Sequence, residues 1–214
     1  MTDVQKGLLL IGGGGHCKSV LCALLAAKPS VSIGIIDSNL QGSLYGVPVV
    51  GRDEDLPLLR EQYSNAFISV GSVGNTHLRR KLYMLAKEAG YIFPNIIDPA
   101  AIVSPYASLG KGVFIGKGAV VNAGARIGDC AILNTGSIVE HDCVVGDFAH
   151  IAPGAVLDGN VYIGEDTHIG SKAVVIQGLC VGERTVIGAG STVLSDIPAN
   201  VVAVGTPCRT IKTK

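Results

Sequence analysis

The stretch LNTGSIVEHDCVVGDFAHIAPGAVLDGNVYIG, residues 133–164, carries an aliphatic residue at every sixth position. The same period runs in both directions from this stretch without a change of register. The sixteen aliphatic residues are Val103, Leu109, Ile115, Val121, Ile127, Leu133, Val139, Val145, Ile151, Leu157, Ile163, Ile169, Val175, Val181, Ile187 and Val193. The position four residues after each of them is mostly small, as at Ala119, Ala131 and Ala155.

A period of six excludes an α-helix, because 3.6 residues per turn do not divide into six. A solenoid accommodates it, with one short strand per hexad, the aliphatic side chain inside, and Gly, Asn or Asp near the turn. Three hexads make one triangular coil of about 18 residues, and stacked coils bury their aliphatic side chains in continuous ladders. We therefore predict an all-β parallel β-helix of hexapeptide repeats over residues 96–214.

The N-terminal third alternates short apolar runs with helical segments, as is typical of a Rossmann-like βαβαβ unit with a parallel sheet. We expect strands at 7–11, 31–36 and 66–70, helices near 16–28, 53–63 and 75–89, and a turn-rich segment at 42–48. The prediction is an α/β domain at 1–95 followed by the β-helix domain.

The glycine loop GGGGH (12–16) lies between the first expected strand and helix. Backbone N–H groups and a helix N-terminus at such a place can receive a phosphate. Cys17 stands where a dinucleotide motif has its third glycine, which favours a nucleotide-linked substrate over a whole NAD. A tight turn without a ligand is the alternative. Asp37, at the end of the second strand, could hydrogen-bond a ribose or sugar hydroxyl.

Composition excludes several classes of protein. Of 214 residues, 48% are hydrophobic and 16% charged, which is too apolar for a disordered chain, yet no run of about 18 apolar residues predicts a membrane span. The 17 basic and 17 acidic side chains form no basic cluster, which argues against nucleic acid. The six cysteines form no C-x-x-C pair, and the start MTDVQKGLLLIGGGGH lacks a signal-peptide pattern. We expect a cytoplasmic protein with reduced thiols.

Five segments resemble one family over nearly the whole chain. They are GGGGH (12–16), IIDS (35–38), SVG (69–71), residues 133–164 and VGTPCR (204–209). The chain resembles the hexapeptide-repeat N-acetyltransferases of nucleotide-linked 4-amino sugars, which act on GDP-perosamine or on the UDP-bacillosamine precursor. The resemblance implies a left-handed coil, acetyl-CoA as co-substrate, and a homotrimer with active sites between subunits. Lipopolysaccharide O-antigen, glycoprotein glycans and capsule are all compatible destinations for the product.

The resemblance also assigns catalytic roles. His141 matches the family's general base, a role that suits imidazole because it accepts a proton near neutral pH. Asp142 matches the acidic residue that orients the histidine, with Asp in place of Glu. Neighbours along a strand face opposite ways, so this pairing requires a turn or a second subunit. Gly159 matches the glycine whose backbone N–H polarises the acetyl carbonyl.

The same resemblance suggests the binding residues. On the CoA side these are His150, Gly159, Ser171 and Ala189; on the substrate side they are Gly14, Gly15, His16, Asp37, Ser38 and Gly71. His150 and His168 are one coil apart and are predicted to stack. Asp37-Ser38 replaces an acidic pair of the UDP-using type, and the loop after Gly71 is longer. Both departures favour GDP-perosamine over a UDP-linked 4-amino sugar.

Three other functions have to be considered for a chain of this fold. A sialic acid O-acetyltransferase and a non-catalytic nucleotide-sugar-binding scaffold share the expected fold. A zinc hydratase of this fold needs two histidines in an H-x4-H arrangement, which His141, His150 and His168 do not form, so no metal is expected. Direct acetyl transfer needs no covalent acyl-enzyme, and Cys143 is predicted to lie in the core.

Overall fold

The computed structural model of the chain describes residues 7–28 and 30–214. These residues form two compact units. The first contains the described residues up to Gly71 and the segment His77–Pro94, and the second contains Ser72–Thr76 and Asn95–Lys214. Residues 1–6 lie outside the described residues; they include the start of the expected α/β domain and of the N-terminal segment without a signal-peptide pattern.

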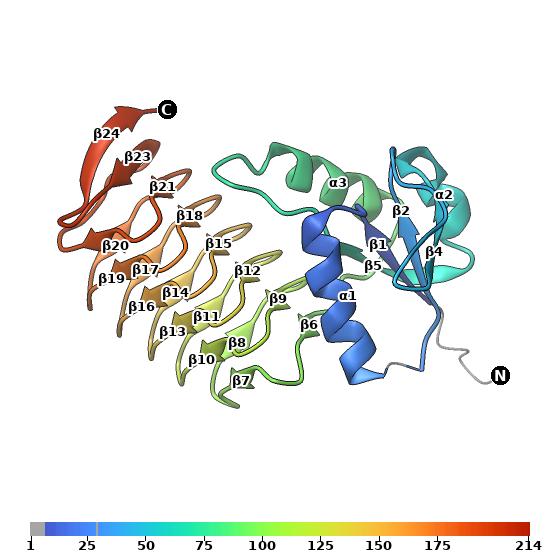
Figure 1. Ribbon diagram of the computed structural model, residues 1–214, viewed down its shortest axis with the longest axis horizontal. Coiled ribbons are helices and arrows are strands. Elements are labelled where there is room, and N and C mark those ends of the chain that lie inside the picture. Colours follow the sequence, from blue (N-terminus) through green and yellow to red (C-terminus); the bar gives the residue numbers. More distant parts are fainter. Residues whose placement is uncertain (1–6, 29) are drawn as a thin grey trace. The chain divides into compact units, whose positions relative to one another are not determined.

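The first unit is an α/β fold around one sheet with the strand order β3-β4-β2-β1-β5 (Figure 1). The strands are β1 (Gly7–Ile11), β2 (Ile33–Ile36), β3 (Ser43–Leu44), β4 (Val47–Gly51) and β5 (Tyr63–Ile68), and the helices are α1 (Gly15–Ala27), η1 (Asp53–Asp55), α2 (Leu56–Leu59) and α3 (His77–Glu88). All pairs are parallel except the hairpin β3–β4. β1 is buried along its whole length, as expected of an apolar strand inside a parallel sheet. The predicted α/β unit is confirmed.

The structure differs from the sequence prediction at three places in this unit. The turn expected within 42–48 is present at Tyr45 and Gly46, but it belongs to the hairpin β3–β4, whose second strand pairs with β2 and widens the sheet. The helix expected over 53–63 ends at Leu59, and β5 begins at Tyr63 instead of Ala66. Tyr63 is buried and pairs with Gly7, so pairing with β1 overrides the helical propensity of the charged segment before it.

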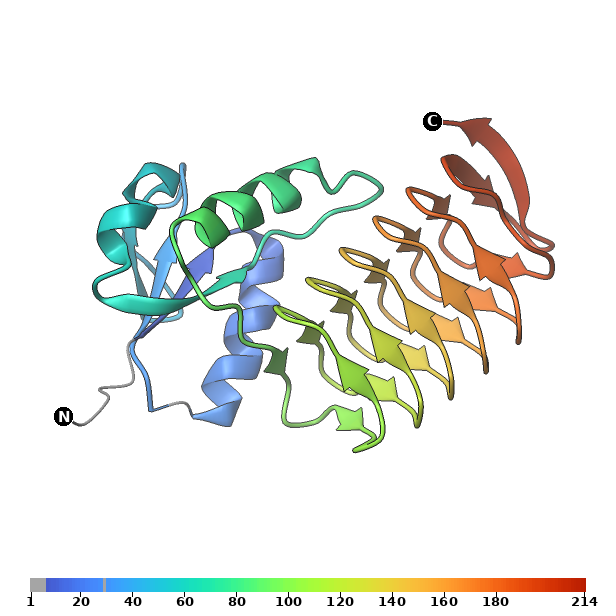
Figure 2. The same cartoon turned by 180° about the vertical axis from the view of Figure 1, so that it is seen from behind.

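The second unit is a parallel β-helix with three faces (Figures 1 and 2). The first face contains β6 (Ile96–Ile97), β9 (Phe114–Ile115), β12 (Ile132–Leu133), β15 (His150–Ile151), β18 (His168–Ile169), β21 (Val186–Ile187), β23 (Val201–Val204) and β24 (Arg209–Thr213). The second face contains β7 (Ile102–Val103), β10 (Val120–Val121), β13 (Ile138–Val139), β16 (Val156–Leu157), β19 (Val174–Val175) and β22 (Thr192–Val193). The third face contains β8 (Ser108–Leu109), β11 (Arg126–Ile127), β14 (Val144–Val145), β17 (Tyr162–Ile163) and β20 (Cys180–Val181). Each coil pairs in parallel with the next, except that β24 returns antiparallel to β23.

The predicted aliphatic ladder forms the core of this unit. Fourteen of the sixteen periodic side chains are buried, from Ile115 to Val193. Val103 and Leu109 are partly buried against the same core, because β7 and β8 begin their faces and have a neighbouring strand on one side. The small residues between them, including Ala119, Ala131 and Ala155, are also fully buried. The hexapeptide β-helix is therefore confirmed, while the hand of its coil stays a prediction.

The turns use two kinds of position. One residue in every hexad from Gly112 to Gly190 has a positive φ, and Gly, Asn, Asp, Cys, Phe, Lys and Arg all occupy this place. The glycine that directly follows the aliphatic residue serves another purpose, because it lies against the next coil. A Cβ at Gly164 would be 2.4 Å from the backbone nitrogen of Glu183. The glycines in the sequence therefore reflect both the left-handed turns and the close packing of successive coils.

Candidate active site

The turns between the second and third faces hold the predicted catalytic residues. His141 and Asp142 follow β13, and Gly159 follows β16 one coil later. Asp142 has a φ of 61°, a left-handed conformation that Asp tolerates better than most residues. This turn lets two neighbouring side chains meet, so the His–Asp pairing arises within one chain and does not require a second subunit.

His141 and Asp142 form a hydrogen-bonded pair at the surface. Nδ1 of His141 lies 2.9 Å from Oδ2 of Asp142, and the two side chains are 63% and 66% exposed. Because an ionised carboxylate only accepts hydrogen bonds, Nδ1 carries the proton of the neutral ring and Nε2 keeps its lone pair. The pair is therefore arranged to accept a proton at Nε2.

Gly159 lies directly against this ring. A Cβ at position 159 would be 2.5 Å from Nε2 and 2.6 Å from Cε1 of His141, far inside van der Waals contact. Only glycine fits here without displacing the imidazole. Among the described residues, the N–H of Gly159 has no hydrogen-bond acceptor, so it is available to a ligand.

A depression of about 460 Å³ opens at this edge and is lined by His141, Gly159, Asn160, Gln177 and Gly178. Asn160 and Gln177 were not among the predicted site residues. Their signal was the coil period itself, because His141, Gly159 and Gln177 are each 18 residues apart and occupy equivalent turn positions. Reading that period outward from His141 identifies Gln177, and reading it from Asp142 identifies Asn160.

His150 and His168 pair in register on the first face, as predicted. Their ring centroids are 4.8 Å apart in an edge-to-face arrangement, and both residues are more than nine-tenths buried. His150 contacts the main chain of Ser72 through Nδ1 and the side chain of Asn134 through Nε2. Burial lowers the pKa of His168 below 6.5, and no described residue bonds its Nδ1.

Ser171 and Ala189 lie on a different edge, between the first and second faces. They follow β18 and β21, and a Cβ at Gly170 would be 2.5 Å from the backbone nitrogen of Ala189. Within one chain, the whole second face separates these two residues from His141. The structure therefore brings the three predicted catalytic residues together, and it leaves the predicted CoA contacts Ser171 and Ala189 on another edge.

In the first unit, Asp37 organises the glycine loop. Its Oδ2 accepts a hydrogen bond from the N–H of Gly13 at 2.7 Å, and its Oδ1 accepts from Asn39 and Leu40, both at 2.8 Å. Burial raises the pKa of this carboxyl, but the three backbone hydrogen bonds lower it more, and the net pKa lies below 3.8. Asp37 thus has a structural role, and a contact with substrate stays a prediction.

The other predicted substrate residues of this unit surround the beginning of α1. Gly14 is the N-cap of the helix and has extended backbone, and added Cβ atoms at Gly14 and Gly15 would meet nothing within 4 Å. Gly71 lies beside His16, with its Cβ position 3.2 Å from Cβ of that histidine. Open glycines at a helix N-terminus suit an anionic group such as a phosphate. Ser38, next to Asp37, is exposed.

Other predicted features fall outside these sites. Cys143 is fully buried in the β-helix core, as predicted, and burial raises the pKa of its thiol.

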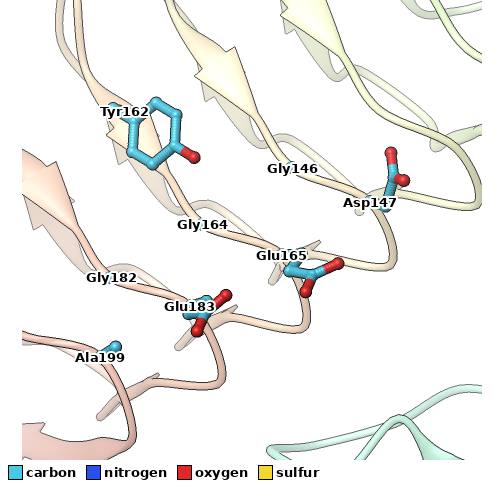
Figure 3. Close-up of a pocket in the computed structure, with 8 residues that line it drawn as sticks. All are labelled: Gly146, Asp147, Tyr162, Gly164, Glu165, Gly182, Glu183 and Ala199. Carbon is cyan, nitrogen blue, oxygen red and sulfur yellow. The ribbon is translucent and has the colours of Figure 1, made fainter.

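A second depression, of about 630 Å³, is lined by Tyr162 and three stacked carboxylates, those of Asp147, Glu165 and Glu183 (Figure 3). It does not include His141.

The described residues contain neither a metal-binding cluster nor a membrane-spanning helix. Within residues 7–28 and 30–214, no group of three or more His, Cys, Asp or Glu side chains is placed to hold a metal ion. No helix in the same part of the chain has the length and apolar character needed to cross a bilayer.

Family models match most of the chain. The PglD N-terminal domain matches residues 7–85, a hexapeptide repeat of succinyl-transferase matches 106–141, and the bacterial transferase hexapeptide matches 160–195. A comparison with curated proteins found no match.

Several solved structures match over nearly the full length of the chain. Perosamine N-acetyltransferase from Caulobacter crescentus, in complex with CoA and GDP-perosamine, is 42% identical, with 96% of this chain and 97% of that chain covered and a TM-score of 0.91. The acetyltransferase domain of PglB from Neisseria gonorrhoeae, in complex with acetyl coenzyme A, is 38% identical, covers 97% of this chain and 100% of that domain, and has a TM-score of 0.91. The matched Caulobacter structures include histidine-to-asparagine and histidine-to-alanine mutants. This chain belongs to the hexapeptide-repeat sugar N-acetyltransferases with a PglD-type N-terminal domain.

Proposed function

We propose that this enzyme transfers the acetyl group of acetyl-CoA to the 4-amino group of a nucleotide-linked 4-amino-4,6-dideoxy sugar. GDP-perosamine is the preferred acceptor, and a UDP-linked 4-amino sugar is next. The similarity to the Caulobacter enzyme, whose structure contains CoA and GDP-perosamine, supports this choice. The observation that carries the proposal is the arrangement around His141. Gly159 packs against Nε2, the nitrogen that can accept a proton, while Nδ1 is hydrogen-bonded to Asp142.

The reaction is a direct transfer. The sugar amine attacks the thioester carbonyl, the new C–N bond forms, and the C–S bond breaks to release CoA as a thiol. Nε2 of His141 takes the proton that the amine loses, and Asp142 stabilises the resulting imidazolium. The N–H of Gly159 stabilises the negative charge that develops on the carbonyl oxygen. The imidazolium then returns its proton to the CoA thiolate or to water.

Thiol release from acetyl-CoA tests this function. Wild type is offered GDP-perosamine, a UDP-4-amino sugar and a sialic acid in parallel, and mass spectrometry locates the acetyl group on the product. Rapid turnover of one sugar nucleotide with an N-acetyl product supports the proposal. Turnover of sialic acid alone would replace it with O-acetylation, and tight binding of a sugar nucleotide without turnover would favour a scaffold.

We further infer a homotrimer whose active sites each use two chains. The outward side chains of the second face form an apolar ladder, namely Ile102, Val120, Ile138, Val156 and Val174, and each is at least partly exposed. Such a stripe favours burial against another copy. It lies between the His141 edge and the edge of Ser171 and Ala189. If this face packed against a second chain, an edge of one chain, carrying either His141 or Ser171 and Ala189, would lie beside an edge of the other chain.

Two matched substitutions test the assembly. Val156→Asp places a charge on the second face, and Val144→Asp places it at the equivalent strand position on the third face. We expect the first to give monomers by light scattering with loss of turnover, and the second to remain an active trimer. A trimeric, active Val156→Asp variant would contradict the two-chain site.

The finer assignments rest on the same proposal. Residues 1–95 would bind the sugar nucleotide through Gly14, Gly15, His16, Ser38 and Gly71, and residues 96–214 would carry out the acetyl transfer. The expected compartment is the cytoplasm, because all six cysteines are free thiols. Synthesis of lipopolysaccharide O-antigen is a suitable use of the product.

A further inference from the structure

The segment Ser72–Thr76, here called the strap, belongs to the β-helix unit although residues on both sides of it belong to the first unit. It directly follows Gly71, a proposed substrate residue. We propose that His150 is a positioning residue that holds the strap, and that the strap in turn sets the position of the sugar-nucleotide loop. This inference rests on the proposed function and gives His150 a role other than contact with CoA.

His150 is suited to this role because its neighbours determine its tautomer. The N–H of Thr135 donates to Oδ1 of Asn134 at 2.8 Å, which orients the amide so that its nitrogen faces His150. That nitrogen lies 3.1 Å from Nε2 and donates to it, so Nε2 carries no proton. Nδ1 therefore carries the proton and donates it to the carbonyl oxygen of Ser72 at 2.9 Å. Both hydrogen bonds require a neutral ring.

The burial of His150 agrees with a positioning role. The residue is 9% exposed, whereas the proposed base His141 is 63% exposed in its side chain. With both ring nitrogens hydrogen-bonded inside the unit, the imidazole has no further lone pair or proton to offer to CoA.

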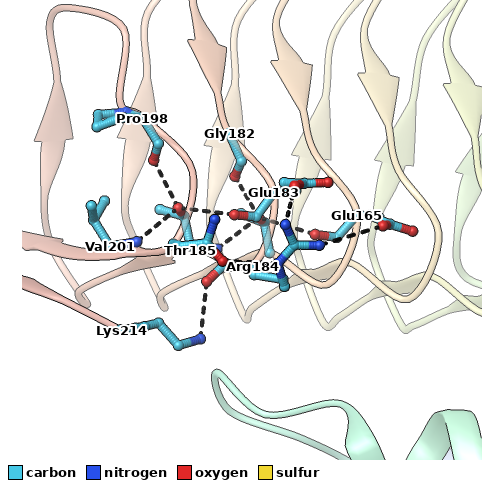
Figure 4. A network of polar contacts seen from close by, with 10 residues as sticks. Glu165, Gly182, Glu183, Arg184, Thr185, Pro198, Val201 and Lys214 are labelled. Carbon is cyan, nitrogen blue, oxygen red and sulfur yellow. Dashed lines mark hydrogen bonds and ion pairs between the residues drawn. The ribbon is translucent and has the colours of Figure 1, made fainter.

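Later coils hold the rest of the strap. The hydroxyl of Thr76 donates to Oδ1 of Asp166. The ammonium group of Lys214 donates to the carbonyl oxygen of Gly74 at 2.6 Å and to that of Arg184 at 3.0 Å; Figure 4 shows the second of these bonds. Gly74 has a φ of 69°, and a Cβ there would be 2.6 Å from Val186. Attachments to three successive coils leave the strap little freedom.

The consequence for the reaction follows from chain connectivity. Ser72 is bonded covalently to Gly71, so a fixed Ser72 carbonyl limits where the backbone of Gly71 can lie. Releasing the strap would misplace the acceptor and leave the acetyl donor unaffected. Weaker attachment should therefore raise KM for the sugar nucleotide and change KM for acetyl-CoA little.

Steady-state kinetics of His150→Ala and His150→Asn, with both substrates varied, test this inference. The amide nitrogen of Asn can replace the Nδ1 donor. We expect KM for the sugar nucleotide to rise about tenfold in His150→Ala, as for the loss of one buried hydrogen bond, and to recover largely in His150→Asn. Thr76→Val and Lys214→Met should raise the same KM by about two- to fivefold. Lys212→Met, on β24 two residues before Lys214, is the control and should match wild type.

Hydrogen exchange of the peptide containing residues 69–80 supplies a readout independent of turnover, and we expect faster exchange in His150→Ala but not in Lys212→Met. An increase confined to KM for acetyl-CoA, with Thr76→Val and Lys214→Met unchanged, would overturn the inference in favour of CoA contact. If the wild type is inactive on every sugar nucleotide, the proposed function is wrong. Independently of that result, unchanged hydrogen exchange in His150→Ala would contradict the proposal that His150 holds the strap.

Discussion

The two predicted site histidines of the β-helix lie in opposite environments. His141 is exposed on a turn, bonded to a carboxylate, and packed against a glycine that leaves its second nitrogen accessible. His150 is buried on a strand between an amide and a main-chain carbonyl. A charged partner stabilises the imidazolium and suits proton transfer, whereas neutral partners that use both nitrogens hold the ring in one neutral form. Sequence position alone does not distinguish these roles.

The largest expected effect removes the base. His141→Ala should lower kcat by about 10³-fold, within the usual range for general base catalysis, with small changes in either KM. Thiol release measures this, and circular dichroism checks the fold. A kcat within tenfold of wild type would show that His141 is not the base. The different environments of His141 and His150 would then not correspond to different roles in the reaction.

Removal of the carboxylate should have a smaller effect. Asp142→Asn keeps a polar group of the same size but no longer stabilises a positive imidazole, so kcat should fall about 10- to 100-fold. Because the loss arises from the basicity of His141, the pH at which kcat reaches its plateau should also shift. An unchanged pH profile would indicate that Asp142 only helps to form the turn and does not influence proton transfer by His141.

Gly159→Ala tests the close approach at the same edge. The added methyl would displace the imidazole from its position, and we expect a loss of about 10-fold or more in kcat. Gly118→Ala is the control, since it also replaces a turn glycine but meets open space. That variant should lose only about 1 kcal/mol of stability, from its positive φ, and should keep full activity.

The smallest effect concerns the buried pair on the first face. The pKa of His168 is lowered in the folded state, so below pH 6.5 the unfolded chain binds more protons and the folded state loses stability. His168→Phe removes this titration. Its melting temperature should therefore fall less than that of wild type between pH 7 and pH 5, by about 1–3 °C. Parallel melting curves would contradict a buried neutral imidazole.

The sequence was sufficient for the β-helix because one requirement repeats in every coil. Each hexad needs an aliphatic side chain at one inward position, and sixteen repetitions leave little ambiguity in register. The first unit has no such repeat, and errors followed there. The hairpin at 43–51 and the early start of β5 depend on pairing with strands that are distant in the sequence, which local propensity does not encode.

The candidate site divides in the same way. Resemblance of sequence identified His141, Asp142 and Gly159, and the 18-residue period could have added Asn160 and Gln177. By itself, the sequence determined the solenoid, its register, and which turn holds the candidate base. Only the tertiary structure showed that Asp142 reaches His141 through a left-handed turn, that Asp37 accepts a hydrogen bond from the glycine loop, and that His150 hydrogen-bonds Ser72 in the strap. The last two assignments depend on hydrogen bonds between residues 24 and 78 positions apart, and no local pattern specifies such partners.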